Sequence, residues 1–170
     1  MSDGMTIRPL GQPGDLGWVT LAHGEVYAEE FGWNGEFEAV VAQIVSDYAR
    51  KHDSTREAAW IAERDDERVG CVFVVQKSPD VAQLRILLVH PSGRGRGLGQ
   101  QLVNVAIDFA ARVGYRRLVL WTNHPLEAAR RIYLAAGFVL TAEEPHRSYG
   151  VDLIGQSYQL ELTPFILQGV

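Results

Sequence analysis

The chain has 170 residues, of which 46% are hydrophobic, and 16 Lys and Arg against 21 Asp and Glu give it a formal net charge of −5. This length and apolar content suit one domain with a real core and leave no room for a second domain. The negative charge argues against nucleic-acid binding, which needs a basic face, and no apolar run approaches the roughly 18 residues of a membrane span.

Hydrophobic periodicity and turn residues predict an alternation of strands and helices along the chain. In chain order the predicted elements are a strand at 6–10, helices at 15–31 and 37–48, strands at 59–63, 68–76 and 81–89, a helix at 98–113, a strand at 118–122, a helix at 126–136, and strands at 138–141 and 157–162. Strands separated by crossover helices require a mixed sheet covered by helices. The sequence therefore predicts an α/β (α+β) fold of about six to seven strands and about four helices. We expect one domain over residues 5–163, with terminal extensions at 1–4 and 164–170.

The strand predicted at 68–76 contains the single cysteine, Cys71. An apolar run surrounds this residue, so we expect a buried thiol that forms no disulfide, which favours a reducing compartment. The N-terminus has no basic segment followed by an apolar one, so no secretion signal is expected. Together these features predict a cytoplasmic protein.

The segment between the strand at 81–89 and the helix at 98–113 is rich in glycine. Its four glycines stand at alternate positions: Gly93, Gly95, Gly97 and Gly99. Amide N–H groups at a helix start carry the positive end of the helix dipole, and glycines let an anion approach them without a Cβ in the way. Arg94 and Arg96 add positive charge, and His90 is expected to cap the turn. This loop predicts a site for a nucleotide-like cofactor that carries a pyrophosphate.

Two commoner phosphate loops are excluded by the residues present. A P-loop needs a Gly-Lys pair, and the chain has none. The dinucleotide fingerprint G-x-G-x-x-G fails because Leu98 and Gln100 stand where the third glycine is needed. The remaining pattern, Arg94-x-x-Gly97-x-Gly99, resembles the [QR]-x-x-G-x-[GA] acyl-CoA loop of the GNAT superfamily of N-acetyltransferases.

A second motif supports the same resemblance. The segment Ala129-x-x-x-Tyr133-x-x-x-Gly137-Phe138 is similar to the A-x-x-x-Y-x-x-x-G-F segment of that superfamily. The predicted order of strands and helices is also similar to the GNAT fold. Residues 120–123, 129–133 and 146–150 further resemble the acetyltransferase domain that is fused to MarR-type regulators in bacteria.

The resemblance implies acetyl-CoA as the co-substrate. It implies that the strand at 86–89 splays from the strand at 118–122, and that acyl-CoA lies in the gap and pairs with backbone groups there. A backbone N–H in this gap could also stabilise the oxyanion of the reacting carbonyl. The residues that the resemblance assigns to the cofactor are Leu87, Leu88, Val89, Arg94, Gly95, Arg96, Gly97, Leu98 and Gly99.

The resemblance also implies a role for Tyr133. A neutral phenol, with a pKa near ~10, can protonate the departing CoA thiolate as the sulfur gains charge. The acceptor would be a primary amine of a small molecule, an amino acid or a peptide, which attacks the thioester directly. The alternative is a non-catalytic acyl-CoA-binding sensor or interaction module that keeps the loop without turnover.

A base must take the proton of the attacking amine. The candidates are Glu29 and Glu30, which precede an aromatic segment, and His146, which is predicted on a late loop. Each of them could equally be a solvated surface residue. Many family members carry an asparagine seven residues before the tyrosine, where this chain has Leu126, and Asn123 is out of register with that position, so a cofactor contact from it is doubtful.

The remaining chemistry-bearing residues give no metal or covalent site. No His, Cys or carboxylate cluster has metal-ligand spacing, and no nucleophile elbow marks a Ser-His-Asp arrangement. We expect an amine acceptor as the partner, without nucleic acid or membrane. The strand near 158–162 could pair or swap between two subunits, which leaves a homodimer open.

Overall fold

The computed structural model describes residues 4–163, so the predicted terminal extensions lie outside it apart from Gly4. In chain order the elements are β1 (Met5–Pro9), α1 (Asp15–Phe31), α2 (Gly35–Lys51), β2 (Ala58–Arg64), β3 (Glu67–Ser78), β4 (Val81–Val89), the 3-10 turn η1 (Pro91–Gly93), α3 (Leu98–Arg112), β5 (Arg117–Asn123), α4 (Glu127–Ala135), β6 (Val139–Ser148) and β7 (Val151–Glu161). Within the described range no helix is long and apolar enough to cross a membrane.

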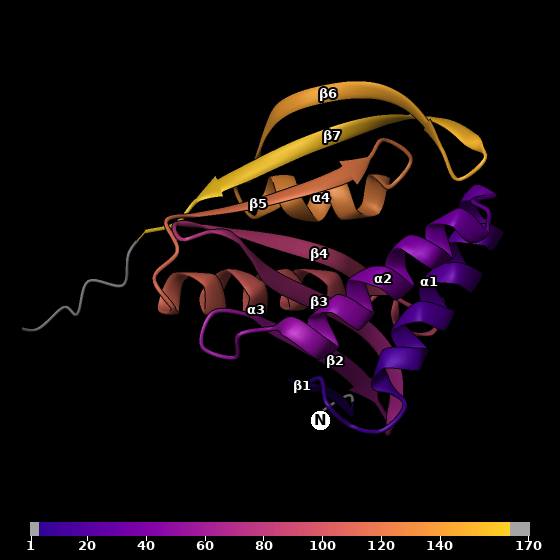
Figure 1. Ribbon diagram of the computed structural model, residues 1–170. Coiled ribbons are helices and arrows are strands. Elements are labelled where there is room, and N and C mark those ends of the chain that lie inside the picture. The colour runs from indigo at the N-terminus through magenta and orange to yellow at the C-terminus, as the bar shows by residue number, and fades with distance from the viewer. Residues whose placement is uncertain (1–3, 164–170) are drawn as a thin grey trace, which may run out of the picture.

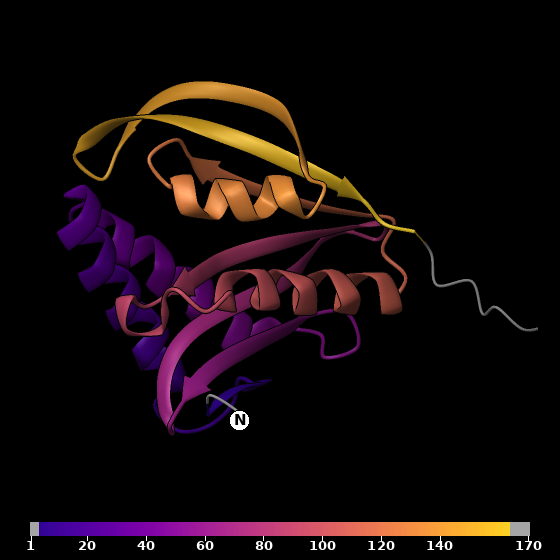
Figure 2. The same cartoon turned by 180° about the vertical axis from the view of Figure 1, so that it is seen from behind.

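The strands form one seven-stranded sheet in the order β1-β2-β3-β4-β5-β7-β6. Neighbouring strands are antiparallel, except that β4 and β5 are parallel. Helices α1 and α2 cover one face of the sheet, and α3 and α4 cover the other (Figure 1 and Figure 2). This arrangement confirms the predicted fold class, a mixed sheet flanked by helices.

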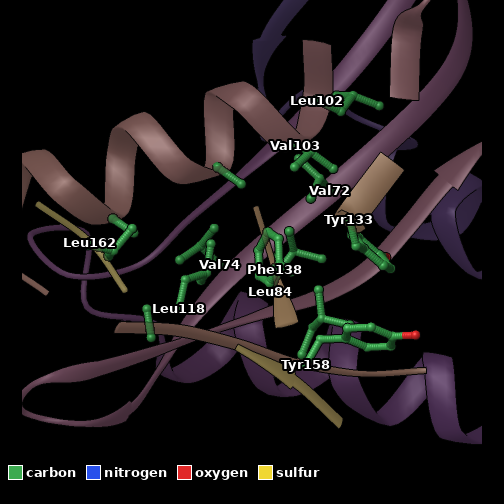
Figure 3. Packing of buried hydrophobic residues seen from close by; sticks show 14 of the residues in the cluster. Val72, Val74, Leu84, Leu102, Val103, Leu118, Tyr133, Phe138, Tyr158 and Leu162 are labelled. Atoms are coloured by element: carbon green, nitrogen blue, oxygen red, sulfur yellow. The ribbon is translucent and has the colours of Figure 1, made fainter. Parts of the chain in front are cut away.

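Two apolar clusters fill the space between the sheet and its helices. Successive residues of β3 alternate between them, because strand side chains point to opposite faces. Val72 and Val74 belong to the cluster under α3 and α4, part of which is drawn in Figure 3. Cys71 and Phe73 belong to the cluster under α1 and α2. The thiol of Cys71 is fully buried, as the sequence predicts.

The parallel pair β4–β5 separates after three residue pairs. Val81, Ala82 and Gln83 pair with residues 117–119, and no later residue of β4 pairs with β5. Beyond this point, the register of β4 against β3 shifts, and Ile86 has a positive φ of 43°. The extra residue in β4 is a bulge, which bends a strand and increases its twist. The predicted splay between the two strands is therefore confirmed.

The last hairpin is longer than the sequence predicts. Strands were expected at 138–141 and 157–162, whereas β6 and β7 pair from Val139 and Gln159 to Ser148 and Val151. Most of β6 is exposed at the edge of the sheet, so its polar residues carry no apolar alternation to reveal a strand. His146 consequently lies in β6 rather than on a loop. Both edges of β7 are paired within the chain, so the edge strand at this end of the sheet is β6 and not the strand near 158–162.

A buried carboxylate fixes the start of α1 to the sheet. Asp15 is fully buried and accepts two hydrogen bonds from the guanidinium of Arg8, both at 2.9 Å, and one from Arg68 Nε at 2.8 Å. The backbone N–H groups of Gly11 and Gln12 also donate to it, at 2.9 and 2.8 Å. Burial favours the protonated acid, but these donors outweigh it and hold the pKa of the carboxyl well below its usual range.

We expect Asp15→Asn to lower the free energy of unfolding by about 3 kcal/mol or more at neutral pH, because two arginines lose their buried counter-charge. Since folding depresses this pKa, the contribution is present above pH ~4 and is lost as the pH falls. Urea unfolding at neutral pH measures the change. The matched control is Asp152→Asn, which breaks the exposed pair with Arg147 and should cost less than about 1 kcal/mol. Equal losses in the two variants would contradict the role of Asp15.

Candidate functional site

The glycine-rich loop presents the start of α3 without a side chain over it. Gly95 and Gly97 have positive φ values of 85° and 72°, and a Cβ added at either would meet no atom within 4 Å. Gly97 is the N-cap residue of α3, and it gives no side-chain hydrogen bond to the first-turn amides. The positive end of the helix dipole thus faces open space, as an anion site requires. His90 caps the preceding turn as expected, because its Nδ1 accepts the N–H of Ser92 at 3.2 Å.

The other two glycines of the loop have a packing role, which corrects the expectation that all four serve anion approach. A Cβ added at Gly93 would lie 2.9 Å from Val69 Cβ, against β3. A Cβ added at Gly99 would lie 2.5 Å from Ile132 Cδ1, on α4. These glycines let the loop and α3 approach the neighbouring elements closely.

A cavity that we call the loop cavity runs from this loop along the free edge of β4. Its lining includes Tyr27, Glu30, Leu87, Leu88, Val89, Arg94, Gly95, Gly97, Leu98, Gly99, Gln100, Leu126 and Arg131. All the residues predicted to bind the cofactor therefore lie around it except Arg96. Arg94 Nη1 forms an ion pair with Glu30 Oε1 at 2.5 Å, which joins the loop to the end of α1.

A second cavity, here called the aromatic cavity, lies on the α1 and α2 side of the splayed strands. Its lining is His23, Tyr27, Trp33, Phe37, Val40, Val41, Ile44, Gln83, Leu84, Arg85, Ile86, Leu87, Trp121, Thr122, Asn123, Leu126, Tyr133 and Tyr149. Tyr27, Leu87 and Leu126 line both cavities, so the two meet at these residues. The junction is where a ligand in one cavity would reach a ligand in the other.

Tyr133 stands in the wall of the aromatic cavity. It is held on α4 by ring contacts with Phe138 and Tyr158, at centroid distances of 5.7 and 6.4 Å (Figure 3). Burial raises the pKa of its phenol above the usual range. The side chain therefore stays protonated near neutral pH and can donate a proton or a hydrogen bond. Tyr27 shares this property, because burial and the neighbouring Tyr133 raise its pKa as well.

The structure separates the two glutamates that were predicted as bases. Glu29 is exposed and lines neither cavity. Glu30 lines the loop cavity, where its carboxylate is engaged by Arg94. Neither glutamate therefore lines the aromatic cavity, which is on the far side of the junction from the loop.

His146, the third candidate base, reaches the aromatic cavity through Asn123. Its Nε2 lies 2.7 Å from Asn123 Oδ1, and its Nδ1 lies 2.9 Å from Ser148 Oγ. Because the amide oxygen can only accept, Nε2 carries the proton and Nδ1 accepts from the hydroxyl. Both ring nitrogens are thus used, and His146 positions Asn123 instead of offering a lone pair. Asn123 itself is buried in the cavity wall.

Sequence reasoning missed His23, which stands one helical turn before Tyr27 on α1. It is 1% exposed, and its Nδ1 donates to the carbonyl oxygen of Val19 at 2.7 Å. Its Nε2 has no hydrogen-bond partner among residues 4–163. Burial lowers the pKa of His23 to about 4, so the ring is neutral and Nε2 has an unused lone pair. A lone histidine on an apolar helix face gives no local sequence signal of this environment.

Arg85 was also missed, because a single arginine inside an apolar strand is not a motif. It is half-buried in β4 and lines the aromatic cavity. Over the described range no group of three or more His, Cys, Asp or Glu side chains could hold a metal ion.

Comparison with known proteins points to the same family as the two sequence motifs. The model of the acetyltransferase (GNAT) family matches residues 22–138. An uncharacterized N-acetyltransferase of Schizosaccharomyces pombe is 32% identical over 123 residues, which cover 71% of this chain and 73% of that protein. N-acetyltransferase 8F1 of Rattus norvegicus is 32% identical over 108 residues, but the chain spans only 47% of its length.

Solved structures show the same fold at lower identity. The structure of yncA from Salmonella typhimurium with its cofactor acetyl-CoA has a TM-score of 0.76 at 23% identity, covering 94% of this chain and 95% of that one. An N-acetyltransferase from Staphylococcus aureus Mu50 also has a TM-score of 0.76, at 18% identity, covering 94% and 99% of the two chains. These likenesses show a shared fold.

The buried neutral ring of His23 should make the protein acid-sensitive. Between the unfolded pKa of 6.5 and the folded value of about 4, the unfolded chain binds a proton that the folded protein does not. Stability is therefore fully present above pH ~6.5 and falls by up to about 3 kcal/mol as the pH drops towards 4. Urea unfolding across this range should show the loss in the native protein and a smaller one in His23→Phe. The same pH slope in both proteins would contradict this origin.

Proposed function

Because the chain belongs to the acetyltransferase (GNAT) family, we propose that it transfers the acetyl group of acetyl-CoA to a primary amine, with both substrates bound together. One observation carries the proposal. The bulge at Ile86 opens β4 from β5, and the opening connects an anion site at the start of α3 with a separate aromatic cavity. A donor and an acceptor can thus enter from opposite sides and meet at Tyr27, Leu87 and Leu126.

The residues around the loop cavity fit acetyl-CoA. The open space at Gly95 and Gly97 leaves room for phosphate oxygens against the α3 amides, and Arg94 adds a charge-assisted donor. Residues 87–89 face the opening with no β5 partner, so their backbone groups can pair with pantetheine amides. The related fold of yncA holds acetyl-CoA, which supports the same co-substrate here. We assign its binding to Leu87, Leu88, Val89, Arg94, Gly95, Arg96, Gly97, Leu98 and Gly99.

When bound, acetyl-CoA would supply an activated thioester. In the transfer, the bond from the acyl carbon to sulfur breaks and a bond to the amine nitrogen forms. The nitrogen loses one proton and the thiolate gains one. Tyr133 holds a proton on its buried phenol in the wall of the aromatic cavity, so we assign it the protonation of sulfur. Glu29 and Glu30 stay predictions for the base, and His146 acts through Asn123.

Several finer points stay predictions that the sequence alone supports. They are the resemblance to the acetyltransferase domain of MarR-type fusions, the cytoplasmic location, and a homodimer. The domain boundaries at 5 and 163 are likewise proposed. We favour turnover over the sensor alternative because the aromatic cavity gives an acceptor a place of its own beside the donor cleft.

The direct test is release of CoA thiol from acetyl-CoA in the presence of a panel of amines, amino acids and peptides. We expect turnover, and we expect Tyr133→Phe to lower kcat by about 100-fold or more with little change in acetyl-CoA affinity. The matched control is Tyr158→Phe, a buried neighbour that lines neither cavity and should keep kcat. Acetyl-CoA binding without thiol release from any acceptor would favour the sensor. Full turnover in Tyr133→Phe would remove its assignment.

Arg94 should govern affinity for the donor. We expect Arg94→Gln to raise the Kd for CoA by about 10-fold, because it removes a charge-assisted contact with phosphate, and to reduce the salt dependence of binding. Arg112→Gln, at the exposed far end of α3, is the matched control and should bind normally. Calorimetric titration measures both, and an unchanged Kd in Arg94→Gln would contradict the phosphate role.

Glu30→Gln separates two roles of Glu30. If the carboxylate only neutralises Arg94, its removal should lower the Kd for CoA and leave kcat unchanged. If Glu30 is the general base, kcat should fall instead.

A further inference from the structure

We propose that the amine acceptor carries a carboxylate, as an amino acid does, and that Arg85 binds this group in the aromatic cavity. The proposal rests on the proposed function, because it takes the aromatic cavity as the acceptor site. It selects one of the acceptor classes that the sequence leaves open and argues against polyamines. The proposal is carried by the position of Arg85, its lack of a partner and the charge of the cavity wall.

The strand geometry directs Arg85 towards α1 and α2. Ala82 and Leu84 pack in the cluster under α3 and α4, so the alternate residues Gln83 and Arg85 face the other side of the sheet. The lining of the aromatic cavity includes both. The bulge at Ile86 follows immediately, so Arg85 stands where β4 leaves β5 and the cavity opens.

Arg85 has no protein counter-charge. Among residues 4–163 its guanidinium makes no ion pair and no hydrogen bond, whereas Arg8, Arg68 and Arg94 each form an ion pair with a carboxylate. A half-buried guanidinium presents donors in a planar fork that matches a carboxylate. Because water only partly solvates such a group, an anionic ligand at this place would satisfy donors that the protein leaves unused.

The remaining wall of the cavity favours the same class of ligand. Among the described residues that line it, Arg85 alone carries a formal charge, since His23 is neutral, and none is a carboxylate. A polycation would therefore meet a like charge and no counter-charge. The orphaned Nε2 of His23 is a second unmet polar group in this wall, which indicates a site built for a ligand rather than closed core.

The aromatic rings provide a place for the apolar part of such an acceptor. Trp33 packs against Phe37 and Tyr149 at centroid distances of 4.8 and 5.0 Å, and Tyr27 packs against Phe37 at 4.8 Å. These rings form a rigid wall on the α1 and α2 side. An amino acid with an apolar side chain would thus place its carboxylate at Arg85 and its side chain on the rings.

The test compares matched acceptors that differ only at the carboxylate. Leucine and phenylalanine are assayed against leucinamide and phenylalaninamide by thiol release, with spermidine as the polycation. The amides differ from the acids in amine basicity, so a single comparison of kcat/KM would mix two effects. We therefore take the ratio of kcat/KM for the acid to kcat/KM for the amide in each protein, and divide the native ratio by the Arg85→Gln ratio. We expect this quotient to be about 10-fold or more. Arg50→Gln, at an exposed position on α2 outside both cavities, is the control and should give a quotient near one.

A binding measurement keeps the proposal independent of turnover. Calorimetry on the CoA-loaded protein should show amino acids binding more tightly than their amides, and Arg85→Gln should abolish the difference. If that holds while no amine is acetylated, the carboxylate site stands and the proposed function fails. If amides or spermidine are acetylated as well as the acids, or Arg85→Gln keeps the native preference, the carboxylate site is overturned while the proposed function stands.

Discussion

The separation of β4 from β5 is the constraint on which the rest of the site depends. One extra residue at Ile86, held at a positive φ, ends the parallel pairing after Gln83. A continuous parallel sheet would bury the edge of β4 and close both cavities. Since the bulge also places Arg85 and Ile86 together on the α1 and α2 side, the same local distortion opens the donor cleft and equips the acceptor side.

The two sides of this opening have different chemistry because different layers supply them. The loop side is polar because backbone amides are exposed there. Gly95 and Gly97 leave these amides uncovered, since neither has a side chain. The aromatic side takes much of its wall from α1 and α2, and the buried Asp15 network fixes the start of α1 to the sheet. Tyr27 lines both cavities and Tyr133 lines the aromatic cavity, and burial keeps both phenols protonated.

The sequence predicted the parts of the site that are local in the chain. The glycine loop and the segment around Tyr133 are short motifs on single elements, and the fold class followed from the order of strands and helices. Features that depend on contacts between distant elements were missed. His23 resembles any core residue of α1 until β4 and α4 are in place, and β6 gains its length only by pairing with β7. Glu29 and Glu30 are adjacent in sequence, yet only Glu30 faces a cavity.

The charged residues at the sheet and around the cavities show how the protein distinguishes scaffold from site. Asp15 is saturated by donors, so it can hold an element in place but has nothing left for a ligand. Arg94 is paired with Glu30 in the lining of the loop cavity. Glu30 balances the charge of Arg94 in the free protein, and the phosphates of acetyl-CoA would compete with Glu30 for Arg94. Arg85 has no such partner. Because Arg85 is half-buried in the acceptor wall, water only partly solvates its guanidinium, and a ligand that brings an anion would supply the missing counter-charge.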